Sequence, residues 1–246
     1  MAALSGPIWQ GWPMLRIRAA SGGDPVTPEP VDPFPAALLG DAPYAHYAAE
    51  DAGATWTARH GLPLVMDRAG DPVLADGWLD CAAGCYTADR EAWPADTPFE
   101  LWALCQPNAL IGRQFYNGPQ VYSNNPVSFA TRLSDAGVFS GNTVRAYAPP
   151  AASGPRTYSW ARTGPGNMSA VMQVRVANQI IAASTTADRA TSAAGDWFVV
   201  GGSMSSGGAA VPQGLIVRDV LLTVGWVMSD AQRTALEVYA KSRGAA

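Results

Sequence analysis

The sequence predicts an all-β fold, a two-sheet jelly-roll sandwich that ends in one short C-terminal helix. Its 25 glycines and 20 prolines interrupt the chain at turn-like intervals, which favours about a dozen short strands over long helices. No long amphipathic pattern precedes the last helix. The 246 residues, 48% hydrophobic and 15% charged, are enough for one sandwich with a sizeable core.

The clearest local signature lies near the C-terminus. Residues 214–224 form a mostly apolar, β-branched run with the length of a buried strand. Ser229 or Asp230, placed before Gln232, offers a side-chain cap for a helix over residues 231–241. The sequence therefore predicts a strand, a capped turn and a closing helix, in that order.

The remaining strands are expected between breaks made by proline, glycine and asparagine. Residues 70–77 are expected to form a turn region, and residues 81–96 are helix-compatible or irregular. The expected strands are residues 44–48, 62–66, 99–106, 110–116, 120–123, 127–133, 144–148, 156–163, 171–177, 179–183, 197–201 and 215–224.

The C-terminal order resembles the ending of laminin-G-like domains of the concanavalin A-like lectin superfamily. Residues 98–107 resemble the central strand of that family, and residues 172–182 resemble its hairpin of two strands around an Asn-Gly turn. The turn here is expected at Asn178-Gln179, without the glycine that best suits a positive φ, so the hairpin is expected to be bulged or longer. The resemblance covers roughly residues 42–244 and implies a lectin-like sandwich.

One strand has the composition of a ligand-binding face. Strict alternation over residues 156–162 puts Arg156, Tyr158, Trp160 and Arg162 on one side and small residues on the other. Aromatic rings stack on sugars and guanidinium groups pair with carboxylates, so this face suits an acidic glycan. The alternative is that both aromatic side chains pack inward while the arginines extend to the strand ends.

Two further sets complete the candidate binding residues. Trp102 shares a strand face with Glu100, Leu104 and Gln106, which suggests a partly exposed groove or a tryptophan that bridges the sheet and a covering loop. Tyr116 and Tyr122 lie near asparagine-rich turns, which are typical of recognition loops and also of ordinary turns. The candidate glycan-binding residues are Arg156, Tyr158, Trp160, Arg162, Trp102, Tyr116 and Tyr122.

Catalytic and metal-binding patterns are weak. The five glutamates, at positions 29, 50, 91, 100 and 237, are scattered, whereas a glycosidase needs two carboxylates that flank the scissile bond. We therefore expect no enzymatic activity. No cofactor is expected; calcium, bound by some laminin-G-like domains, would have to use Asp67, Asp71 or Asp76, whose spacing does not favour it.

The three cysteines, Cys81, Cys85 and Cys105, are an odd number without zinc-knuckle spacing. Buried, reduced thiols are the main expectation. The alternatives are one disulfide, Cys81–Cys85 or Cys85–Cys105, and a metal site.

The N-terminal segment differs in composition from the rest. An apolar peptide over residues 1–18 is followed by prolines at positions 25, 28, 30, 33 and 35, typical of a stiff, extended spacer. We expect an arm over residues 1–35 and a sandwich over residues 36–246. Because exposed tryptophans promote aggregation, the arm should dock on a partner or a neighbouring subunit, or else pack on its own domain. The candidate anchor residues are Ile8, Trp9, Trp12, Met14, Leu15 and Ile17.

The overall charge and the termini limit the possible partners. A net charge of −4 gives no general electrostatic support for a nucleic-acid partner. No basic region followed by an apolar stretch begins the chain, and no run approaches the ~20 apolar residues of a membrane span. We expect synthesis in the cytoplasm without a signal peptide.

These features together suggest a surface component of a phage or phage-like virion, such as a spike, fibre tip or decoration protein. Its arm would join other virion subunits as part of an oligomer, and its lectin-like domain would bind cell-surface polysaccharide. The second expectation is a purely structural capsid or tail decoration protein that stabilises subunit contacts without binding glycan. Both expectations rest on fold and architecture.

Overall fold

A computed structural model describes the chain over residues 33–88, 98–106, 115–118, 127–131, 136–140, 143–147, 154–162, 172–184, 197–205 and 207–245. Contacts divide the chain into Met1–Asp32 and Pro33–Ala246. The first unit, with all six candidate anchor residues, lies outside the described residues. The predicted arm therefore stays a prediction.

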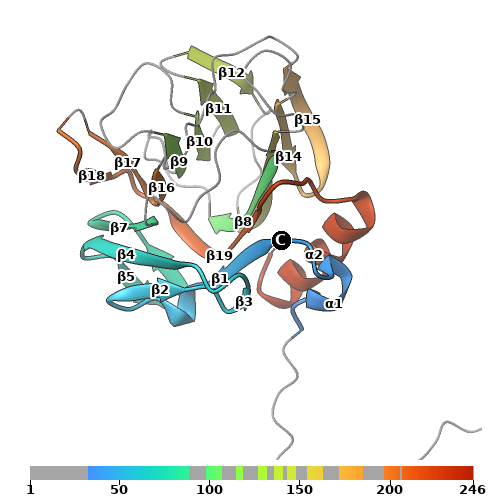
Figure 1. Cartoon of the computed structure of the whole chain (residues 1–246), viewed down its shortest axis with the longest axis horizontal. Helices are drawn as coiled ribbons and strands as arrows, with labels where there is room; N and C mark the ends of the chain where they lie inside the picture. The colour runs from blue at the N-terminus through green and yellow to red at the C-terminus, as the bar shows by residue number, and fades with distance from the viewer. Residues whose placement is uncertain are drawn as a thin grey trace, which may run out of the picture. The chain divides into compact units, whose positions relative to one another are not determined.

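The second unit is the predicted jelly-roll-like sandwich of two antiparallel sheets (Figure 1). The first sheet has the order β15 (Gln179–Ser184), β14 (Met172–Val176), β13 (Arg156–Arg162), β8 (Phe99–Gln106), β19 (Ile216–Thr223), β1 (Tyr44–Ala48) and β3 (His60–Gly61), with β6 (Trp78–Asp80) beside β19 and β5 (Val73–Ala75) beside β6. The second sheet has the order β12 (Thr143–Tyr147), β11 (Ala136–Ser140), β10 (Val127–Thr131), β9 (Phe115–Gly118), β16 (Trp197–Val200), β7 (Gly84–Ala88), β4 (Val65–Gly70) and β2 (Thr55–Thr57).

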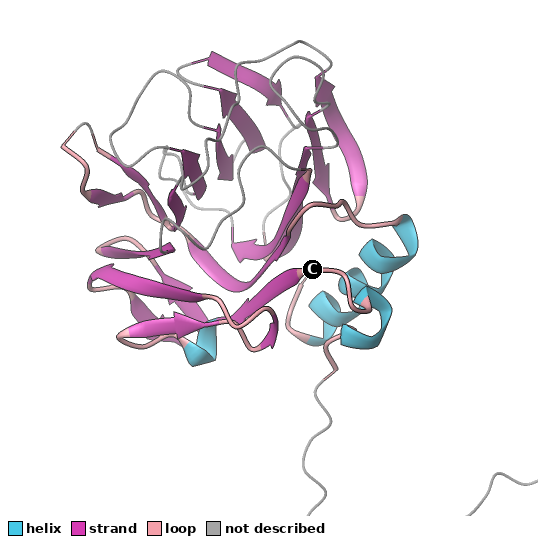
Figure 2. Cartoon of the chain, viewed as in Figure 1, coloured by secondary structure: helices cyan, strands magenta, loops and turns pink. Residues whose placement is uncertain are grey.

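The remaining elements are short apart from one helix (Figure 2). They are the hairpin β17 (Gly202–Met204) and β18 (Ala210–Pro212), the helix α1 (Ala36–Leu39), the 3-10 turn η1 (Ala49–Asp51) and the closing helix α2 (Asp230–Ser242). Ser229 caps α2 as predicted, because its hydroxyl accepts the Gln232 N–H while the Gln232 side chain accepts the Ser229 N–H.

The main core lies between the two sheets. Alternation sends one set of side chains from each strand inward, so that Tyr47 and Leu101 of the first sheet share one cluster with Trp56, Met66 and Phe198 of the second. A second cluster lies on the opposite face of the first sheet, where α2 covers it. It includes Phe34, Leu39, Tyr44, Trp102, Leu104, Leu221, Leu236 and Tyr239.

Three local expectations are wrong. Residues 70–77, expected to form a turn region, contain strand β5, which pairs with β6. Residues 84–88, expected to be helical or irregular, form strand β7, because pairing with β4 and β16 buries the segment at the middle of a sheet. The hairpin turn lies one residue earlier than expected, at Ala177-Asn178, and is a two-residue turn with φ of 46° and 61°. The expected irregularity is present as a register shift between Val174 and Arg175.

Candidate functional site

Strand β13 has the predicted alternation, but its aromatic face points into the sandwich. Tyr158 and Trp160 are 1% and 0% exposed, and their stacked rings belong to the main core cluster. The burial of Tyr158 and Trp160 therefore supports the alternative in which both aromatic side chains pack inward. Arg156 is half-buried at the start of the strand, and the side chain of Arg162 lies outside the described residues.

Trp102 does not lie in an exposed groove, so that expectation is wrong. It is 1% exposed and packs in the second cluster, because α2 and not a loop covers its strand face. Tyr116 lies in β9, but its side chain is outside the described residues, as is the whole of Tyr122. The structure thus brings Tyr158 and Trp160 together and places Trp102 on the other face of the same sheet.

Helix α2 is held on the sheet by a fully buried carboxylate. Arg233 Nε donates to Glu100 Oε1 at 2.8 Å, and Arg233 Nη2 donates to Glu100 Oε2 at 2.7 Å. The Met228 N–H donates to Oε2 at 3.0 Å, and the Ser159 hydroxyl donates to Oε1. Burial alone would lower the pKa of Arg233, but the hydrogen bonds and charges of Glu100 and Asp230 raise it, so the guanidinium group stays charged.

A second buried carboxylate, Asp219, connects the sheet to the C-terminal end of α2. His46 Nε2 lies 3.1 Å from Asp219 Oδ1, which also accepts the Tyr239 hydroxyl at 2.7 Å. Arg243 Nε donates to Oδ2 at 3.1 Å, and its Nη2 donates to Glu50 at 2.7 Å. Burial raises the pKa of Asp219, but the bonds and charges of His46, Arg243 and Tyr239 lower it below its ordinary value.

These two carboxylates do not form a hydrolytic pair. Each side chain is 0% exposed and is neutralised by a guanidinium group, so neither has access to a substrate. Their role is to fix α2 against the sheet.

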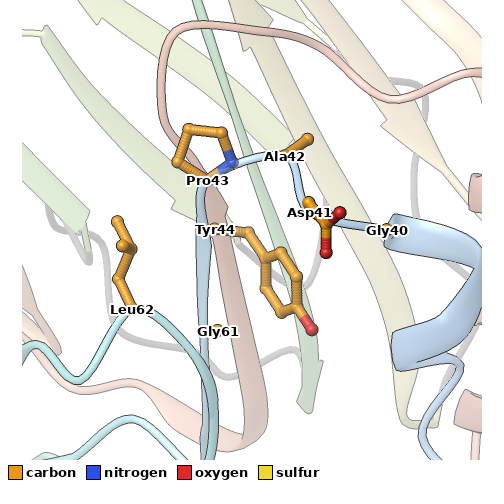
Figure 3. Close-up of a pocket in the computed structure, with 7 residues that line it drawn as sticks. All are labelled: Gly40, Asp41, Ala42, Pro43, Tyr44, Gly61 and Leu62. Carbon is orange, nitrogen blue, oxygen red and sulfur yellow. The ribbon is translucent and has the colours of Figure 1, made fainter.

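An open pocket of about 300 Å³ lies where the chain enters β1, and it is the candidate binding site. Figure 3 shows the Tyr44 ring and the Asp41 carboxylate on one side of the strand and Leu62 on the other. Gly61 has φ of 84°, and a Cβ there would lie 2.1 Å from the Tyr44 carbonyl oxygen, so only glycine fits. The lining residues are Gly40, Asp41, Ala42, Pro43, Tyr44, Gly61 and Leu62.

The pocket combines few polar groups with apolar walls. Asp41 is exposed and supplies a carboxylate. Tyr44 is 5% exposed, so little of its ring is accessible. Burial raises the pKa of Tyr44, which keeps its hydroxyl neutral and able both to donate and to accept. The arrangement suits hydrogen bonding to one small, hydroxyl-rich group against Pro43 and Leu62.

Sequence reasoning missed this pocket. The run Gly40-Asp41-Ala42-Pro43 has the turn composition of a loop before a strand, which was a usable signal for an exposed connection. The approach of Gly61 and Leu62 depends on the pairing of β1 with β3 and on the 2.7 Å bond from the Leu62 N–H to the Tyr44 carbonyl.

The thiols follow the main expectation. Cys81, Cys85 and Cys105 are free and buried. Burial raises the pKa of Cys85 to about 11, so its thiol is protonated and unreactive at neutral pH. Within the described residues, no group of three histidine, cysteine or acidic side chains is arranged to hold a metal ion. Among the described helices, none has the length and apolar character needed to cross a membrane.

Comparison with solved structures shows that other proteins have a fold similar to that of this chain. No protein-family model matches the sequence, and no curated protein matches it. A trans-sialidase-active mutant of Trypanosoma rangeli sialidase superposes with a TM-score of 0.54 and 15% identity over 82% of this chain and 33% of its own. The same sialidase in complex with sialic acid gives a TM-score of 0.51 and 13% identity over 80% of this chain and 33% of its own.

A second kind of structure is also similar. The binding domain of botulinum neurotoxin serotype C1 gives a TM-score of 0.51 and 8% identity over 80% of this chain and 51% of its own. The chain thus spans about a third of the sialidase and about half of the toxin domain. At such identities the likeness concerns the sandwich fold, which is shared by proteins with different activities.

Proposed function

We propose that this chain is a non-enzymatic glycan-binding domain on the surface of a phage-like particle, attached to it by the N-terminal arm. The observation that carries the binding function is the pocket around Asp41 and Tyr44, on a sandwich similar in fold to a part of a sialidase and of a toxin binding domain. The apolar, tryptophan-containing sequence of residues 1–18 supports attachment by the arm.

The pocket favours a neutral sugar over an acidic one. Its seven lining residues include one carboxylate, Asp41, and no lysine, arginine or histidine. A carboxylate repels a sialic or uronic acid but accepts hydrogen bonds from sugar hydroxyl groups. Its volume lies at the lower end for small-molecule sites, which suits a single sugar unit at the end of a chain.

Substitutions in the pocket test this function. Leu62→Trp should fill the pocket and abolish binding, and Asp41→Ala should weaken binding about tenfold through loss of a charge-assisted hydrogen bond. Binding of the full chain to an array of neutral and acidic glycans, followed by NMR titration with the best sugar, measures both effects. Asp67→Asn, an exposed carboxylate in β4, is the matched control and should bind normally. Binding that survives Leu62→Trp would exclude this pocket.

The purely structural role is the second candidate. It is favoured by the burial of Tyr158, Trp160 and Trp102, which removes three of the aromatic residues expected to contact sugar. Deletion of residues 1–32, which keeps Phe34 in its cluster, separates the two roles. Under the proposed function the shortened protein loses incorporation into the particle but keeps glycan binding; a structural protein shows no glycan binding with or without the arm.

A further inference from the structure

Two histidines form a flat surface beneath the first aromatic residue of the described chain. His46 of β1 and His60 of β3 are opposite each other in the strand pair, and their rings lie 5.4 Å apart at 15°. We call these two rings the histidine platform. Phe34 stacks on it, with centroids 3.8 Å from His46 and 4.7 Å from His60, and Tyr239 of α2 meets the Phe34 ring edge-on at 5.4 Å.

The hydrogen bonds assign the proton on His46. Asp219 accepts from Tyr239 and Arg243, and because a carboxylate has no proton to donate, His46 Nε2 must donate to it. The neutral ring therefore has its lone pair on Nδ1. This nitrogen is buried and has no partner among the described residues. A second proton on His46 would form a buried N–H without an acceptor among the described residues.

We propose that the contact of Phe34 with the histidine platform is an acid-sensitive attachment, which loosens the segment over residues 33–40 from the sandwich when His46 is protonated. Phe34 covers one face of the His46 ring, so its movement off the platform would admit water to that ring. The inference goes beyond glycan binding, since it concerns how residues 33–40 are held on the sandwich. Leu38 is tied to α2 in the same segment, through the 3.0 Å bond from Gln232 Nε2 to its carbonyl.

Burial, more than the surrounding charges, opposes the extra proton on His46. Asp219 of β19 faces His46, but it is already paired with Arg243, which also binds Glu50. The charges of Arg59 and His60 act on the ring from the β3 side, and the Tyr239 ring of α2 meets it edge-on at 5.9 Å. Burial lowers the pKa of His46 below its ordinary value of 6.5, against the opposing effect of Asp219.

The sign of the pH dependence follows. In the closed state Phe34 lies on the histidine platform, and in the open state it has moved off. The open state binds the proton more readily, so the closed state is fully favoured above the ordinary pKa of 6.5. This preference for the closed state is lost progressively as the pH falls from 6.5 toward the lowered pKa of His46 in the closed state. The equilibrium constant between the closed and open states falls by at most about tenfold per pH unit for one proton.

Hydrogen exchange of the full chain tests the attachment. We expect protection of residues 34–40, after correction for intrinsic rates, to be lower at about pH 5.5 than at about pH 7.5, by up to about tenfold. Protection of the β8 strand should not change. His46→Gln keeps an N–H donor for Asp219 but does not titrate, so its protection should depend on pH less than that of the wild type. His60→Gln, which leaves His46 intact, is the matched control and should keep most of the dependence. Equal or greater protection of the wild type in acid would overturn the proposal, as would an unchanged dependence in His46→Gln.

A direct titration covers the case in which His46→Gln does not fold. The pKa of His46 in the wild-type protein, measured from its ring proton by NMR, should lie below 6.5. In Phe34→Leu, which removes the stacked ring, the pKa should shift back upward. A wild-type value at or above 6.5, or one that Phe34→Leu leaves unchanged, would contradict the attachment.

Discussion

Both faces of the first sheet bury apolar side chains, but the face under α2 also buries charged groups. The inward face places Tyr158, Trp160 and their apolar neighbours against the second sheet. The outward face, under α2, places Glu100 and Asp219 against Arg233 and Arg243. Apolar packing tolerates many arrangements of similar volume, whereas a buried carboxylate requires a particular partner at a particular place. We infer that the charged face determines where α2 lies.

The largest effect should come from breaking the outward face. Arg233→Met removes the guanidinium group and leaves Glu100 buried without its charge partner, which should lower the free energy of unfolding by about 3–5 kcal/mol. Urea denaturation measures this loss. Asp230→Ala is the control, because Asp230 is 88% exposed and its contact with Arg233 is screened by water. A loss no larger than that of the control would mean that the pair does not hold the helix.

A smaller effect is expected at the other carboxylate. Tyr239→Phe deletes the hydroxyl that donates to Asp219 at 2.7 Å and should cost about 1.5–3 kcal/mol, the usual contribution of a hydrogen bond to a charged group. Thermal unfolding at neutral pH gives the measurement.

The matched substitution on the inward face should have almost no effect. The Tyr158 hydroxyl is buried and has no hydrogen-bond partner among the described residues, so Tyr158→Phe should leave stability within about 0.5 kcal/mol or increase it. If Tyr158→Phe and Tyr239→Phe lower the free energy of unfolding equally, the hydrogen bond to Asp219 does not distinguish the outward face from the inward face.

The sequence predicted the elements whose signals are local. The strand over Phe99–Gln106 has the predicted bounds, and the alternation in β13 is correct, because both follow from the period of a strand. The capped α2 was predicted from Ser229 and Gln232, which are three residues apart. Strand β7 was missed because its glycine-containing segment is a strand only through its neighbours.

The candidate site could not be predicted in the same way. Alternation separates the two faces of β13 but does not say which face meets the core, and the aromatic face proved to be the inner one. Arg233 and Glu100 are 133 residues apart in the chain, and His46 and Asp219 are 173 apart. Such pairs depend on the topology of the whole sheet, which local patterns do not specify.

Gly61 joins two features that are otherwise separate. Gly61 lines the pocket and directly follows His60 of the histidine platform. Because it has no side chain, β3 lies close enough to β1 to form both the pocket and the platform. A methyl group at this position would drive the two backbones apart and disturb sugar recognition and acid response together. Inherited variation at this single codon would therefore be under double constraint, and natural variants of the chain should retain glycine there even where the specificity of the pocket has diverged.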